Sequence, residues 1–119
     1  MRYRVVASYI EARLPEFYRK LTDGSIESQR PDGREILASM KRARITEPGV
    51  IQWNETCFCP TPLKHERETV YDRYLTAIAA SEVDEHTESL TGESFWSYLE
   101  RAASGRPDAG AVDRRGGSG

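Results

Sequence analysis

The feature of this sequence most suited to chemistry is a pair of cysteines separated by one residue. Cys57 and Cys59 flank Phe58, and Glu55 and His65 lie nearby in the chain. Thiolates are nucleophiles and soft-metal ligands, and imidazole or carboxylate groups complete many metal sites. The candidate functional cluster is therefore Glu55, Cys57, Cys59 and His65, in which Cys57, Cys59 and His65 would be the metal ligands.

Three interpretations of the cysteine pair stay open. We favour core thiols, because free cysteine behaves as a small hydrophobe and is often buried. A reactive or redox pair is the second interpretation, although an extended strand would place the two Cα atoms about 6.6 Å apart, at the long edge for a disulfide. A metal site is the third, and the sequence offers no second cysteine pair to support it. The cofactor, if there is one, stays unknown.

The elements around the cysteines are expected to be a strand and then a helix. Residues 50–59 alternate in polarity, which predicts a strand that points Trp53 and Glu55 to the core. Pro60 has no N–H and ends the strand, and residues 61–62, Thr-Pro, suit a helix start. The cysteines would then lie just before a helix N-terminus, whose positive end lowers the pKa of a nearby thiol.

The N-terminal half of the chain begins with a predicted strand over 3–10 and an amphipathic helix over 14–21 that ends at Gly24. Residues 35–46 fit either a helix or a strand. We expect a short helical turn and then a strand over 39–45, joined to strand 50–59 by a loop longer than Pro48-Gly49, because a type II turn twists poorly for a two-residue hairpin.

After the helix that starts at Pro62, residues 76–83 predict a last strand, and 93–103 predict a helix capped from Thr91. This order predicts a small single α+β domain over 1–103, with a ferredoxin-like βαββαβ sheet, helices on one face and a C-terminal helix. Residues 104–119 contain five of the nine glycines, and we expect a disordered tail there. This fold hosts many functions and specifies none.

Two other groups of residues have side chains that could support chemistry. His65, Thr69 and Asp72 share a helix face and could form a general base, although a solvated face explains them better. Five basic residues could contact phosphate or RNA, or could protect an edge strand from aggregation. The net charge of −2 argues against nucleic acid. These basic residues are Arg30, Arg34, Lys41, Arg42 and Arg44.

The charge is divided unevenly along the chain. Residues 1–44 carry ten Lys and Arg against six Asp and Glu, and 45–119 carry seven against thirteen. Such polarity can steer a charged partner or support self-association, and a solvated surface is the simpler explanation.

The chain has no signal-peptide core, no apolar run that approaches a membrane span, and no nucleotide, hydrolase or zinc-protease motif. We therefore expect a cytoplasmic protein without a membrane partner. Its biochemical role is not specified. We expect a binding or interaction module that forms a homodimer through its sheet, with a protein or small-molecule ligand that the sequence does not identify. The alternative is a thiol-redox or metal-binding protein centred on Cys57-Phe58-Cys59.

Overall fold

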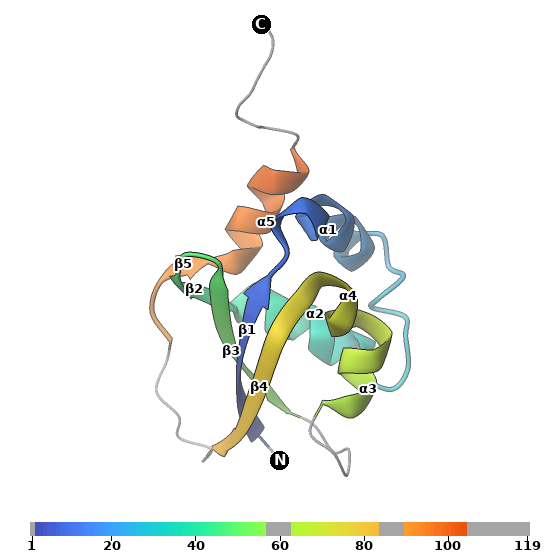
Figure 1. Cartoon of the computed structure of the whole chain (residues 1–119). Helices are drawn as coiled ribbons and strands as arrows, with labels where there is room; N and C mark the ends of the chain where they lie inside the picture. The colour runs from blue at the N-terminus through green and yellow to red at the C-terminus, as the bar shows by residue number, and fades with distance from the viewer. Residues whose placement is uncertain (1, 57–62, 84–89, 105–119) are drawn as a thin grey trace, which may run out of the picture.

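A five-stranded antiparallel sheet forms the centre of the protein in the computed structural model, which describes residues 2–56, 63–83 and 90–104. The strand order is β4-β1-β3-β2-β5, and every recorded pairing is antiparallel. Figure 1 shows the long strands β1, β3 and β4 side by side. The strands are β1 (Arg2–Tyr9), β2 (Arg44–Glu47), β3 (Val50–Thr56), β4 (Leu75–Val83) and β5 (Glu93–Ser94).

Helical segments lie between β1 and β2, before β4 and after β5 in the chain. Figure 1 shows α2 behind the strands, with α1 and α5 in contact at one end of the molecule. Residues 64–74, just before β4, follow a continuous helical course whose winding changes in the middle. The elements are the 3₁₀ turn η1 (Glu11–Arg13), α1 (Leu14–Thr22), α2 (Gly33–Arg42), α3 (Lys64–Glu66), the π-helical η2 (Arg67–Tyr71), α4 (Asp72–Tyr74) and α5 (Phe95–Ala103).

One face of the sheet is packed against the helices. Alternate residues of β1 and β3 are buried on this face, and their neighbours on the other face are half exposed. Val5, Trp53 and Phe17 belong to one core, and all three are fully buried. Phe17 stacks on Tyr74 with 4.4 Å between ring centroids, which ties α1 to α4. The predicted core face of β3, which carries Trp53 and Glu55, is confirmed.

The predicted strand over 39–45 is wrong, because most of that segment belongs to α2. Ile36, Met40 and Ala43 are fully buried, and their spacing of four and three residues places them on one side of a helix. The backbone leaves the helix at Ala43, and β2 begins only at Arg44. Burial of this stripe against the sheet decides a segment whose local pattern suited both structures.

The loop between β2 and β3 is shorter than predicted. It consists of Pro48 and Gly49 alone, and Gly49 adopts a φ of +81°, which fits the third position of a type II turn. The strand register shifts between Ile45 and Glu47, so Thr46 is an extra residue in β2. This bulge accommodates a turn whose twist does not match a regular two-residue hairpin.

The C-terminal helix starts two residues later than predicted. Ser94 caps it by accepting a hydrogen bond from the Ser97 amide, whereas Glu93 and Ser94 form the short β5 beside β2. A Cβ at Gly92 would lie 2.3 Å from the carbonyl oxygen of Ile45, so the chain can reach this edge only with glycine there. The protein is thus a small α+β domain whose sheet has five strands rather than the predicted four.

Candidate functional site

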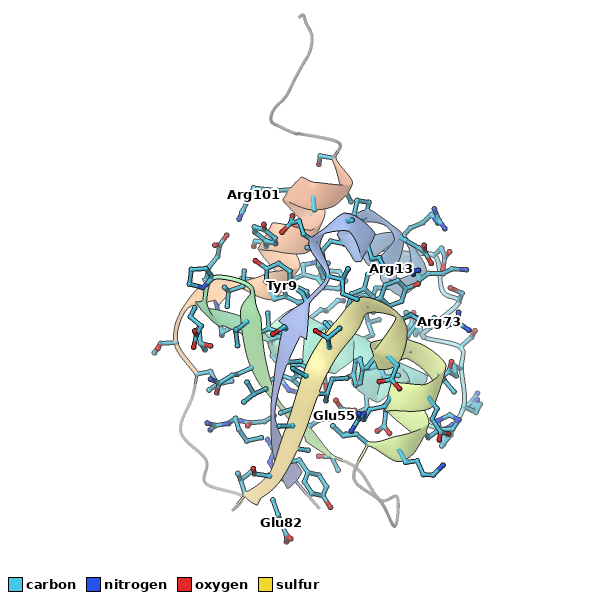
Figure 2. All side chains as sticks on the ribbon, viewed as in Figure 1. Tyr9, Arg13, Glu55, Arg73, Glu82 and Arg101 are labelled. Carbon is cyan, nitrogen blue, oxygen red and sulfur yellow. The ribbon has the colours of Figure 1, made fainter. Side chains whose placement is uncertain are left out.

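The predicted site residues divide between the core and the surface. Glu55 lies on the helix-covered face of β3 and is fully buried, as Figure 2 shows, between the sheet and the α3 segment. His65 lies on α3 and is partly exposed. Each of the two has its own hydrogen-bond partners, and the recorded hydrogen bonds do not join them. Cys57 and Cys59 lie outside the described residues, so the thiol and metal hypotheses stay predictions.

Glu55 is the centre of a buried carboxyl cluster, which we define as Trp53, Glu55, Glu66 and Tyr71. The Oε1 atom of Glu55 accepts one hydrogen bond from Trp53 Nε1 and one from the Tyr71 hydroxyl, both at 2.7 Å. Glu66, on α3, is the other buried carboxyl group of the described residues, and its presence raises the pKa of Glu55. Among the described atoms, no donor lies within hydrogen-bonding distance of Glu55 Oε2, which is also buried.

Burial sets the protonation of this cluster. It raises the pKa of Glu55 to about 8, against the opposing effect of the hydrogen bonds from Trp53 and Tyr71, and the nearby Glu66 raises the pKa further. Burial and the Glu55 carboxyl also raise the pKa of Tyr71 well above its usual range. Glu55 is therefore largely protonated at neutral pH.

The partners of Glu55 do not follow from the strand pattern. Glu66 follows Leu63 by three residues and precedes Val70 by four, so helical spacing places it on the same side as these two apolar residues. This spacing is the sequence signal for the burial of Glu66. Tyr71, whose hydroxyl donates to Glu55, lies in η2, which is wound as a π-helix, a rare geometry that is enriched at functional sites.

A second polar group joins α3 to the residues before α2, and we call it the His65–Asp32 network. His65 Nδ1 and Asp32 Oδ2 are 2.6 Å apart, so the ring N–H donates to the carboxylate. Gln29 Nε2 donates to Asp32 Oδ1 at 3.2 Å and to Thr69 Oγ1 at 2.8 Å. Thr69 in turn donates to the His65 carbonyl. A histidine held by a carboxylate has the orientation of a general base.

The carboxylate of this network differs from the one that the sequence pattern indicated. Asp72 lies 3.6 Å from Arg67, and Glu68 pairs with Lys64, so neither residue is recorded as a partner of the imidazole. Asp32 is 33 residues away in the chain and becomes adjacent only through the fold.

The predicted basic group is separated by the structure. Arg42 lies at the end of α2, where it pairs with Glu35 and donates to the Asn54 carbonyl. Lys41 lies over the Trp96 ring at 5.4 Å. Arg42 is helical whereas Arg44 is in β2, so the two do not share a strand face. Arg30 and Arg34 instead line a surface hollow.

Two hollows flank the side chain of Gln29. Hollow A has a volume of about 320 Å³, and Gln29, Arg30 and Arg34 are among its lining residues. Hollow B has a volume of about 140 Å³ and includes Gln29, Lys20 and Arg73. Neither hollow is lined by Glu55 or by His65.

No helix within residues 2–56, 63–83 and 90–104 combines the length and apolar character needed to cross a membrane. Comparisons of the chain with protein-family models, with curated proteins and with solved structures gave no match. The function must therefore be argued from the geometry.

Proposed function

We propose that the protein is an interaction module that forms a homodimer by pairing the β4 strands of two copies. The observation that carries this proposal is the position of β4, which ends the sheet and, among the strands of the described residues, pairs only with β1. An edge strand presents unpaired N–H and C=O groups that another strand can satisfy. β4 is nine residues long, whereas β5 at the other edge has two residues.

The composition of β4 gives it little protection against pairing. Proteins commonly block edge strands with lysine, proline, short length or bulges. The sequence LTAIAASEV contains no proline and only one charged residue, Glu82, which lies near the C-terminal end of the strand in Figure 2. Ala77 has a φ of +52° beside a shift in register, so a bulge affects the start of β4. From Ala79 to Val83 the pairing with β1 is regular.

This stretch is also compatible with a second copy of itself. In an antiparallel pair whose twofold axis places Ala80 opposite Ala80 of the other copy, Glu82 would face Ile78 of that copy. The two glutamates would therefore not meet, and like charges directly opposite each other would be avoided. The edge is a better candidate than the open face of the sheet, because that face carries Arg4, whose Nε donates to Asn54.

The test is the mass of the full chain by sedimentation velocity over a wide range of protein concentration, for the native sequence and for Ala79→Lys. Ala79 is exposed and pairs with Val6, so lysine there leaves the core intact and places a charge on the edge. We expect a concentration-dependent dimer whose dissociation constant rises at least about tenfold in Ala79→Lys, or about 1.4 kcal/mol.

Ala12→Lys is the matched control, since Ala12 is exposed on η1 and should leave the dimer unchanged. A native protein that remains monomeric at the highest concentration would refute the proposal. Equal weakening by Ala12→Lys and Ala79→Lys would also refute it, because the effect would then follow charge and not the edge.

We further infer that β1 to β4 form a ferredoxin-like core to which β5 is added. Its support is the order of these four strands, β4-β1-β3-β2, and the helical segments that follow β1 and β3. An experimental structure with another order of these strands would overturn this inference.

A further inference from the structure

The two hollows are neighbours on the surface, because Gln29 lines both. The amide of Gln29 is fixed by hydrogen bonds to Asp32 and Thr69. The side chain between the hollows is thus held in place before any ligand arrives, which reduces the cost of binding. We call the pair of hollows the Gln29 cleft.

Cations that lack carboxylate partners gather at this cleft. Lys20 and Arg73 line hollow B, and Arg30 and Arg34 line hollow A. Within the described parts of the chain, none of these four forms an ion pair, whereas Arg42, Lys64 and Arg101 all do. Figure 2 shows Arg73 at the outer side of the α4 segment.

Few carboxylates lie among these cations. Of the residues that the structure describes, Glu27 is the one acidic residue that lines the cleft, and it lies in hollow A. Lys20 also interacts electrostatically with Glu16 and Asp23, which offset part of its charge but do not line the cleft. The cleft therefore has four cations against one carboxylate in a chain whose net charge is −2. Such a local excess of positive charge favours an anion.

The two hollows differ in what they can accept. Hollow B is small, has no acidic lining residue and presents one ammonium and one guanidinium group, which suit the oxygens of a phosphate. Hollow A is larger, at the lower end of the size range of small-molecule sites, roughly 300–1,000 Å³. The hydroxyls of Ser25 and Thr69 donate within the protein, so the cations are the donors left for a ligand.

We propose that the Gln29 cleft binds a small phosphorylated organic molecule, with its phosphate against Lys20 and Arg73 in hollow B and its organic part in hollow A. A single-stranded nucleic acid is the alternative that the test must separate, since its phosphates would meet the same cations. The small volume of hollow B and the acidic balance of the chain favour the small molecule.

The test is a titration of the full-length ¹⁵N-labelled chain, followed by its backbone amide resonances. The probes are inorganic phosphate, adenosine monophosphate, adenosine and a short oligonucleotide, each at constant ionic strength. We expect saturable shifts confined to 20–34 and 69–74 with phosphate and tighter binding of the monophosphate. Adenosine alone should bind far more weakly, because its organic part lacks the anion.

Arg73→Gln should weaken binding of the monophosphate at least about tenfold, and Arg34→Gln should weaken it less. Arg19→Gln is the matched control, since this exposed arginine lies on α1 and does not line the cleft. The proposal is wrong if phosphate gives no saturable shift up to about 10 mM. It is also wrong if Arg19→Gln weakens binding as much as Arg73→Gln, or if the oligonucleotide binds more tightly than the monophosphate.

Discussion

Tyr71 donates its hydroxyl hydrogen to Glu55 Oε1 at 2.7 Å, and this buried bond joins the π-helical segment to the centre of the sheet. Trp53, two residues before Glu55, donates to the same oxygen. A buried polar group that loses a partner destabilises a protein far more than an exposed one does. The stability of the domain should therefore depend on both the protonation and the hydrogen bonds of Glu55.

The first prediction concerns pH. The pKa of Glu55 is about 8 in the folded protein, against an ordinary value of 4.5. Between these pH values the folded protein binds more protons than the unfolded chain does, so the Glu55 contribution makes the free energy of unfolding fall as pH rises. The slope from one group is at most about 1.4 kcal/mol per pH unit. Below pH 4.5 Glu55 is protonated in both the folded and the unfolded state, so its contribution to the free energy of unfolding no longer changes with pH.

Glu55→Gln should remove this slope, because the amide stays neutral and its oxygen can still accept from Trp53 and Tyr71. Urea unfolding at several pH values between 5 and 8 measures the effect. We expect the variant to match or exceed the native protein near pH 8 and to lose that advantage near pH 5. Glu47→Gln, at an exposed site in β2, should leave the slope unchanged. Parallel pH profiles for the native protein and Glu55→Gln would contradict the prediction.

The second prediction concerns Tyr71. Tyr71→Phe keeps the packing of a fully buried ring but leaves Glu55 with one donor fewer, so it should cost about 1–3 kcal/mol in the free energy of unfolding. Tyr98→Phe is the control, since Tyr98 is partly exposed and its hydroxyl donates to an exposed glutamate, Glu11. Urea unfolding at neutral pH compares the two variants. A loss no greater than that of Tyr98→Phe would show that the bond contributes little.

The sequence predicts those members of the buried carboxyl cluster that lie on one strand, and it does not predict the members that come from other elements. Alternation along β3 placed Glu55 beside Trp53 on the core side, and both residues are buried there. Glu66 lies on α3, and Tyr71 lies in η2, which is wound as a π-helix. No periodic pattern in the sequence predicts this π-helical winding, because the winding depends on how the segment packs against the sheet.

The fold, too, has features that local sequence patterns predict and features that they do not predict. Alternation predicted the core face of β3, including Trp53, and the structure confirms it. The segment over 39–45 had a pattern that fitted two structures, and burial against the sheet selected the helix. Strand β5 has two residues, and its pairing of Ser94 with Arg44 spans fifty positions of the chain. Local pattern cannot predict a pairing that only the assembled sheet provides.

The third prediction concerns the His65–Asp32 network. Asp32→Ala removes the acceptor of both the His65 ring and the Gln29 amide, so it should cost about 1 kcal/mol, a value kept small because His65 is partly exposed. Asp72→Ala is the control, since Asp72 is exposed and lies 3.6 Å from Arg67. Thermal unfolding measures both variants. Equal losses in the two would show that the network does not stabilise the fold.

The fourth prediction decides between core thiols and functional thiols. We expect both cysteines to be core thiols, so iodoacetamide at neutral pH should label neither in the folded protein and both in urea. Cys57→Ser and Cys59→Ser should then each destabilise the fold, because a hydroxyl would enter an apolar site. Intact-protein mass spectrometry counts the labels, and urea unfolding of the two variants measures the loss.

A functional Cys59 would give the opposite pattern. The positive end of a following helix would stabilise its thiolate, so labelling would stay fast below the ordinary thiol pKa of about 8.5. Cys59→Ser would abolish that labelling with little loss of stability, whereas Cys57→Ser would retain part of it. Native mass spectra with and without reductant and zinc separate the redox form of this alternative from the metal form. Rapid labelling confined to Cys59 would overturn our expectation and favour the thiol hypothesis over the interaction module.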